Sequence, residues 1–194
     1  VNASALVAVS ANCKALTAPS SAGNDVLEIM KLLLDNGANV NLKENWLGST
    51  AVHPAAAMCR MPQATAIITL LLDRGANINE QNNNGDSALM WAAYYGQTET
   101  VGLLLDRGAT VNDKNNKGES ALMWAGRTGK TEIMILLLDR GANIDDKNSD
   151  GESALVEAAK GGPTESVRLL LDRGANMNEK KNNSESVLTW ANFN

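Results

Sequence analysis

One segment of this sequence contains the residue types that bind nucleotide phosphates in other proteins. Gly126-Arg-Thr-Gly-Lys-Thr131 ends like a phosphate-binding loop, in which backbone amides surround the phosphates and a lysine contacts them. That motif requires a glycine five positions before its Gly-Lys-Thr, and this position is Trp124. Similar segments occur 33 residues before and after Gly129, as Gly96-Gln-Thr-Glu and Gly162-Pro-Thr-Glu. We therefore interpret the segment as a turn between two helices and predict no nucleotide site.

The single histidine and the two cysteines are the other side chains that could do chemistry. His53 has no partners at the spacing of a catalytic base or a metal ligand, and the carboxylates mostly recur at fixed positions typical of helix ends. Cys13 and Cys59 are too few for a disulfide framework, so we predict free thiols and an intracellular, cytoplasmic protein. The sequence predicts no catalytic residue, no cofactor and no metal, and therefore not an enzyme.

The chain is organised as a repeat of 33 residues. Gly85-Asp-Ser-Ala-Leu-Met recurs with small changes at Gly118 and Gly151 and weakens at Ser184, with a spacing of 33 residues each time. A fixed period of this length indicates stacked supersecondary units, each of which buries its apolar face against its neighbours. A second motif, Leu-Leu-Leu-Asp-Arg-Gly-Ala, keeps the same spacing and ends at Ala76, Ala109, Ala142 and Ala175.

Each regular repeat predicts two helices and a turn. Ser87 is a good N-cap for a helix that Gly96 ends, and a second helix follows with leucines at helical spacing. The next ten residues are rich in Asn, Asp and Gly, which favour tight turns. The expected helix pairs are 87–95 with 98–106, 120–128 with 131–139, and 153–161 with 164–172.

This pattern resembles the ankyrin repeat. The family's Thr-Pro-Leu-His signature is matched most closely by Thr50-Ala-Val-His53, and its Gly-Ala-Asn turn by segments that begin at Gly75, Gly141 and Gly174. The resemblance implies an all-α solenoid of helix-turn-helix units with projecting β-turns, which binds other proteins. It also implies that His53 joins adjacent turns through hydrogen bonds.

We expect one ankyrin-repeat domain over residues 1–194. Three irregularities lie near its N-terminal end: about twelve extra residues that read as a loop at 14–24, one in 39–48, and about four near 58–62. The expected units are 1–44 and 45–81, both with insertions, the regular units 82–114, 115–147 and 148–180, and a truncated unit at 181–194.

Aromatic residues gather where such a fold would place a concave binding face. Trp91 and Trp124 lie six residues after the turn glycine of their repeats, and Tyr94 and Tyr95 follow Trp91 on one helical face. Trp46 lies in a polar turn, where core packing is difficult. Aromatic side chains are enriched at binding hot spots. Either partner contact or packing between repeats explains Trp91 and Trp124, and the sequence leaves both open.

Charged residues form a second periodic pattern. Asp86 and Glu119 directly follow the turn glycine, as do Glu152 and Glu185, and a ladder of lysines at 43, 114, 147 and 180 keeps a similar spacing. The two ladders either neutralise one another as surface pairs or contact a partner of complementary charge. The candidate partner-binding residues are Trp46, Asp86, Trp91, Tyr94, Tyr95, Glu119, Trp124 and Arg127.

We interpret the chain as a non-catalytic module that binds another protein through its concave face and projecting turns. Two alternatives stay open: a structural linker or subunit of a larger assembly, and the targeting domain of a longer enzyme. A net charge of −5 disfavours nucleic acid as a partner, since such binding neutralises phosphates. No apolar run reaches about eighteen residues, so we expect no membrane insertion.

Overall fold

The structure is a computed structural model that describes residues 3–11, 22–58 and 63–178. These residues form ten helices and no β-strand; an isolated antiparallel bridge joins Gln81 to Ser87. The chain divides into two compact units, Val1–Ala109 and Thr110–Asn194. The expected all-α repeat fold is confirmed.

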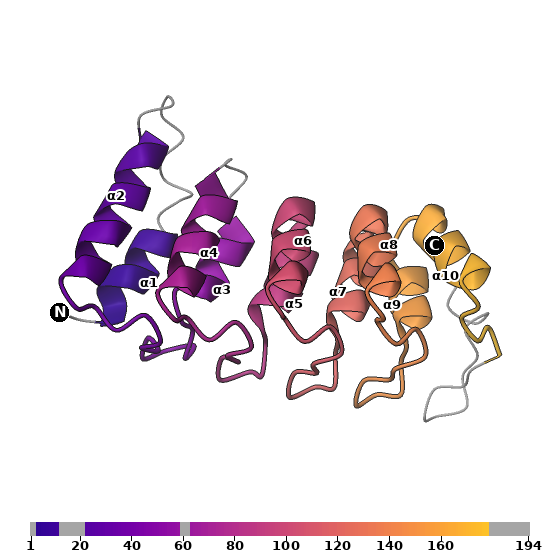
Figure 1. Ribbon diagram of the computed structural model, residues 1–194. Coiled ribbons are helices and arrows are strands. Elements are labelled where there is room, and N and C mark those ends of the chain that lie inside the picture. Colours follow the sequence, from indigo (N-terminus) through magenta and orange to yellow (C-terminus); the bar gives the residue numbers. More distant parts are fainter. Residues whose placement is uncertain (1–2, 12–21, 59–62, 179–194) are drawn as a thin grey trace. The chain divides into compact units, whose positions relative to one another are not determined.

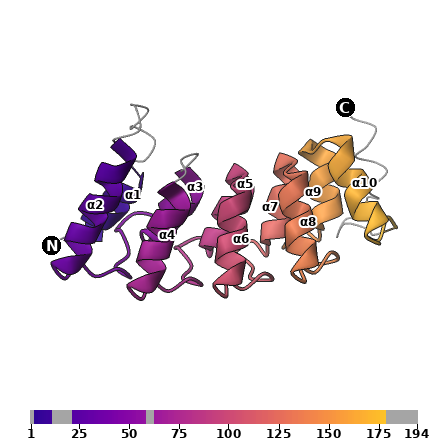
Figure 2. The same cartoon turned by 45° about the horizontal axis from the view of Figure 1, so that its top comes forward.

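The first unit contains three helix pairs that follow one another in chain order (Figures 1 and 2). First helices pack against first helices, and second helices against second helices. The pairs are α1 (Ala3–Ala11) with α2 (Ala22–Asp35), α3 (Val52–Met58) with α4 (Gln63–Asp73), and α5 (Ala88–Tyr95) with α6 (Thr98–Asp106). The turns after α2 and α4 both leave from the same edge of this stack.

The second unit contains two more pairs of the same kind. They are α7 (Ala121–Thr128) with α8 (Thr131–Asp139), and α9 (Ala154–Gly161) with α10 (Thr164–Asp172). Helix α7 packs on α9, and α8 packs on α10, so the layering of first and second helices is the same as in the first unit.

Residues at the helix ends explain why the predicted pairs are confirmed to within one residue. Ser87 precedes α5 and its Oγ accepts a hydrogen bond from the Met90 amide at 3.4 Å, which satisfies one free donor of the first turn. Ser120 and Ser153 do the same for α7 and α9. Gly96 ends α5 with φ of 78°, a left-handed conformation that other residues rarely adopt.

Each unit buries its apolar residues between the two helix layers. The largest buried side chains of the first unit are Met30, Ile67, Ile68, Leu71, Met90 and Leu104. Those of the second unit are Leu122, Met123, Ile133, Met134, Leu137 and Leu155. Because these positions recur with the repeat, each apolar layer is completed by the neighbouring helix pair and not within one pair.

Polar contacts repeat along the edges of the helix pairs. Arg107 pairs with Asp73 of the preceding repeat at 3.0 Å, and Arg173 pairs with Asp139 at 2.9 Å. These pairs are exposed, so each contributes under about 1 kcal/mol. In the turns, the side-chain amide of Asn41 donates to the Gly75 carbonyl at 2.9 Å.

One sequence expectation was wrong. Residues 22–24 were expected in a loop, but they form the first turn of α2, which has 14 residues where α6 has nine. The added turn lengthens an amphipathic helix that already buries Val26 and Met30. The rest of the expected loop, the segment 59–62 and both cysteines lie outside the described residues, and the division of one domain into six repeats stays a prediction.

We predict that Leu104→Ala lowers the free energy of unfolding by about 2–5 kcal/mol, because Leu104 is fully buried and its truncation leaves a cavity. Leu171→Ala is the control, because the Leu171 side chain is 39% exposed. Urea unfolding followed by circular dichroism measures both. Equal losses in the two variants would contradict the assignment of Leu104 to the core.

Candidate functional site

His53 joins two turns and has no free ring nitrogen. Its side chain is 1% exposed. The Thr50 amide donates to Nδ1 at 3.2 Å, so Nε2 carries the proton and donates to the Asp86 carbonyl at 3.1 Å. Burial lowers the pKa of His53, although the hydrogen bond to the Asp86 carbonyl opposes that shift. The ring is therefore neutral, and its structural role between turns is confirmed.

The turn that carries Trp46 is organised by Glu44. The Trp46 amide donates to Glu44 Oε2 at 2.7 Å, and the amides of Leu47 and Ser49 donate to Oε1. Burial raises the pKa of Glu44, but these backbone donors outweigh it, so the pKa lies below its usual range. Asn83 of the next repeat donates from its side chain to the Trp46 carbonyl at 3.2 Å. The turn is thus fixed while the Trp46 side chain is 92% exposed.

Three aromatic side chains of α5 form one cluster. The rings of Tyr94 and Tyr95 meet edge to face at a centroid distance of 5.2 Å, and Trp91 lies 6.4 Å from Tyr95. Tyr94 and Tyr95 are 40% and 47% exposed, whereas Trp91 is half-buried and its ring meets that of His53 edge to face at a centroid distance of 6.1 Å. The expected exposure of both tyrosines is confirmed, and their contact with a partner stays a prediction.

The acidic residues after Gly85 and Gly118 are buried, and each is held by an asparagine four residues earlier. The Asn115 side chain donates to Glu119 Oε2 at 3.0 Å and its Oδ1 accepts from the Glu119 amide at 2.9 Å. Asn82 holds Asp86 in the same way in the first unit. These carboxylates therefore belong to the turn itself, which the sequence alone did not reveal.

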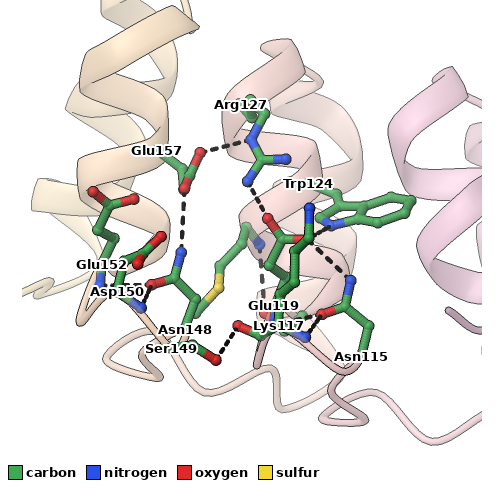
Figure 3. Close-up of polar contacts among 12 residues, drawn as sticks. Asn115, Lys117, Glu119, Trp124, Arg127, Asn148, Ser149, Asp150, Glu152 and Glu157 are labelled. Atoms are coloured by element: carbon green, nitrogen blue, oxygen red, sulfur yellow. Dashed lines mark hydrogen bonds and ion pairs between the residues drawn. The ribbon is translucent and has the colours of Figure 1, made fainter. Parts of the chain in front are cut away.

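In the second unit Arg127 lies between two buried carboxylates (Figure 3). Its Nε donates to Glu157 Oε2 at 2.7 Å, and its guanidinium also contacts Glu119 Oε1. The hydrogen bond to Glu157 is the main reason that the pKa of Arg127 is raised. Burial acts to raise the pKa of Glu119, but hydrogen bonds led by Arg127 lower it. Glu119 Oε2 also accepts from Trp124 Nε1 at 3.0 Å, so Trp124 is tied to the same network.

Described members of both charge ladders pair with residues outside the two ladders, and contact of the ladders with a partner stays a prediction. Glu119 pairs with Arg127, and Glu152 pairs with Lys160 at 2.5 Å, so each acid pairs with a base eight residues later. Lys43 instead pairs with Glu80 at 2.7 Å, and Lys114 with Asp146 at 3.0 Å. The spacing of eight residues between these acids and bases is present in the sequence, but the sequence alone does not show that they pair.

The candidate residues thus fall into two groups. Trp46, Tyr94 and Tyr95 are exposed in the first unit. Asp86 and Glu119 are buried, and Trp91, Trp124 and Arg127 are half-buried. The described residues contain no group of three His, Cys, Asp or Glu side chains that could hold a metal ion. Over the same residues, no helix combines the length and the apolar character needed to cross a bilayer.

Comparison with known families is consistent with this geometry. The family described as ankyrin repeats (3 copies) matches residues 16–115 and 109–181, so the chain belongs to the ankyrin-repeat family. Members of this family generally mediate protein–protein interactions, and their repeats are typically non-catalytic. No curated protein matches the chain.

We predict that His53 makes stability depend on pH. Since the pKa of His53 is lowered in the folded state, the unfolded chain takes up the proton first as pH falls below about 6.5, and stability is lost until the folded pKa is reached. His53→Met is the control, because Met90 occupies the equivalent position of the next repeat. Urea unfolding between about pH 7.5 and 5 should show a steeper loss in the wild type. Parallel curves for the two proteins would rule out this role.

We predict that Arg127→Met lowers the free energy of unfolding by about 1–3 kcal/mol at neutral pH, because two buried carboxylates lose their cation. The loss should shrink at about pH 4, where carboxyls of ordinary pKa begin to protonate. Arg107→Met removes one exposed pair and should cost under about 1 kcal/mol. Urea unfolding of both variants at the two pH values tests this, and equal, pH-independent losses would show that the network adds nothing beyond a surface pair.

Proposed function

We propose that this chain is a non-catalytic module that binds another protein through the first helices and turns of its repeats. The observation that carries the proposal is Trp46, a large aromatic side chain that is 92% exposed on a turn fixed by Glu44 and Asn83. The family's general role in protein–protein interaction supports it.

A fixed, exposed tryptophan favours binding for two physical reasons. Burying its ring in a complex removes a large apolar area from water, which is the main source of affinity at hot spots. The turn that holds Trp46 is already ordered by hydrogen bonds to Glu44, so binding loses little backbone entropy there. Tyr94 and Tyr95 add a second aromatic surface, and these side chains lose little conformational entropy on binding because each has only two rotatable bonds.

The remaining candidates contribute in two ways in this proposal. Trp124 and Arg127 are half-buried, so each can offer part of its side chain to a partner while the network holds it in place. Asp86 and Glu119 are buried and act indirectly, by orienting the residues around them. Net charge of −5 disfavours nucleic acid as the partner. We also propose an intracellular, cytoplasmic location, which rests on the scarcity of cysteine.

We predict that Tyr95→Ala weakens partner binding by about 1–3 kcal/mol, because an exposed aromatic anchor is lost, while the fold stays nearly unchanged. The partner is first captured from the native source and identified by mass spectrometry, and its affinity is then measured by isothermal titration calorimetry. Leu104→Ala is the matched contrast, since it should destabilise the fold and leave the affinity of the folded fraction unchanged.

The opposite result would end the proposal for this surface. If Tyr95→Ala destabilises the chain as much as Leu104→Ala and the folded fraction binds with unchanged affinity, the aromatic cluster is packing and not a contact surface.

A further inference from the structure

A pocket of about 420 Å³ opens in the first compact unit, between α1, α3, the Trp46 turn and Trp91. Its walls are mostly apolar: Val7 and Ala8 come from α1, Pro54 from α3, and the ring of Trp91 from α5. Trp46 also lines it. Pockets of a few hundred cubic ångströms with apolar walls and few polar groups are typical of binding sites.

The pocket lies where two successive repeats have Ala8 and Pro54 at the position that is a tryptophan in the next two repeats. Trp91 and Trp124 lie six residues after their turn glycines, and the residue at this place in the repeat of Gly48 is Pro54. Aligning Leu6 with Leu89 puts Ala8 there in the first repeat. Ala8, Pro54 and Trp91 all line the pocket, so its wall includes two positions that an indole ring occupies in the repeats of Gly85 and Gly118.

Two residues of the pocket lining also have buried polar atoms without hydrogen-bond partners. Ser49 replaces the acidic residue that follows the turn glycine in later repeats; it is 4% exposed, and its Oγ has no hydrogen-bond partner. Trp91 Nε1 is also buried and without a partner. In the second unit the equivalent Trp124 Nε1 donates to Glu119, whereas Asp86, one methylene shorter, stands at the corresponding place before Trp91.

We propose that this pocket binds a bulky apolar side chain from an uncharged or basic segment of a partner polypeptide, and that a carbonyl of this segment accepts a hydrogen bond from Trp91 Nε1. The proposal rests on the proposed function and names the chemistry of the partner. The occupant supplies what the repeat of Gly118 supplies internally: apolar volume at the position of the tryptophan ring, and an acceptor for the indole N–H.

The charge of the pocket lining determines which charge the partner's segment can carry. Glu44 is the ionisable residue of the lining, and its carboxylate is held as an anion by backbone amides of the Trp46 turn. An acidic segment would place two like charges together in a partly desolvated site, while a lysine or arginine beside the apolar residue would be attracted. The acceptor for Trp91 is therefore a neutral carbonyl and not a carboxylate.

The test uses two peptides of the same apolar content and opposite charge. The ¹⁵N-labelled chain is titrated at low ionic strength with Ac-Lys-Leu-Leu-Lys-NH₂ or with Ac-Glu-Leu-Leu-Glu-NH₂, and the indole N–H signals of the tryptophans are followed by NMR. We expect the basic peptide to bind with a Kd at least about threefold lower, which reflects the Coulomb attraction to Glu44. We also expect it to move the Trp91 Nε1–H proton downfield.

Three variants locate the binding. Ala8→Trp introduces the tryptophan found at this position in the repeats of Gly85 and Gly118 and fills the pocket. It should weaken binding of the basic peptide at least about tenfold, since the apolar side chain of the peptide is excluded. Ile29→Trp adds the same residue at an exposed position of α2 outside the pocket lining and should leave affinity within about twofold. Trp91→Phe keeps an aromatic wall but removes the donor and should weaken binding several-fold, read from the Trp46 signal.

Specific results would overturn the inference. Equal affinity for the two peptides contradicts the charge argument, and binding to Ala8→Trp within twofold of the wild type contradicts the location. If Ala8→Trp does not fold, Trp91→Phe tests the proposal instead, because unchanged affinity of this variant would contradict the proposed hydrogen bond. These titrations need no native partner, so their failure is separate from a Tyr95→Ala result with the isolated partner, which tests the proposed function.

Discussion

The acidic residues that follow the turn glycines of the regular repeats are buried, and much of the surrounding structure holds them. A carboxylate out of water is unstable unless it is hydrogen-bonded and paired. Asn115 therefore holds Glu119 from the preceding turn, and Arg127 supplies the charge from the following helix. Because Arg127 also contacts Glu157 of the next repeat, the requirement of one side chain links two repeats. The turn, the first helix and the stacking are fixed together.

Small changes at this position alter the properties of the surface nearby. With Glu119 the carboxylate reaches both a base and the indole of Trp124. Asp86 is one methylene shorter, the residue eight positions later is the uncharged Tyr94, and the indole of Trp91 has no acceptor. With Ser49 there is no carboxylate at all, and the neighbouring turn is organised by Glu44. The series runs from a closed polar network to an apolar pocket without a change of backbone fold.

The sequence was sufficient for the helices and insufficient for the contacts between side chains. Ser87 and Gly96 specify the start and the end of α5 through local interactions, which depend on neighbouring residues only and are therefore readable from the sequence. The exposure of Trp46 was likewise predictable from its polar surroundings. The burial of Glu119 was not, because it depends on an asparagine before it and on a base two turns into the next helix. Its period suggested a surface ladder, and only the structure shows the pairing.

This distribution of charge and apolar surface has a consequence for recognition. In the second unit the arginine and both glutamates satisfy one another, so a partner that competes for any of them must first break a buried pair. In the first unit the fixed apolar groups, with Trp46 foremost, have no such internal partner and are exposed to water. Burying them needs only the displacement of solvent, which favours association. For the proposed binding, the departures from the repeat pattern in the first unit therefore matter most, because they leave exposed apolar surface and unpaired polar atoms.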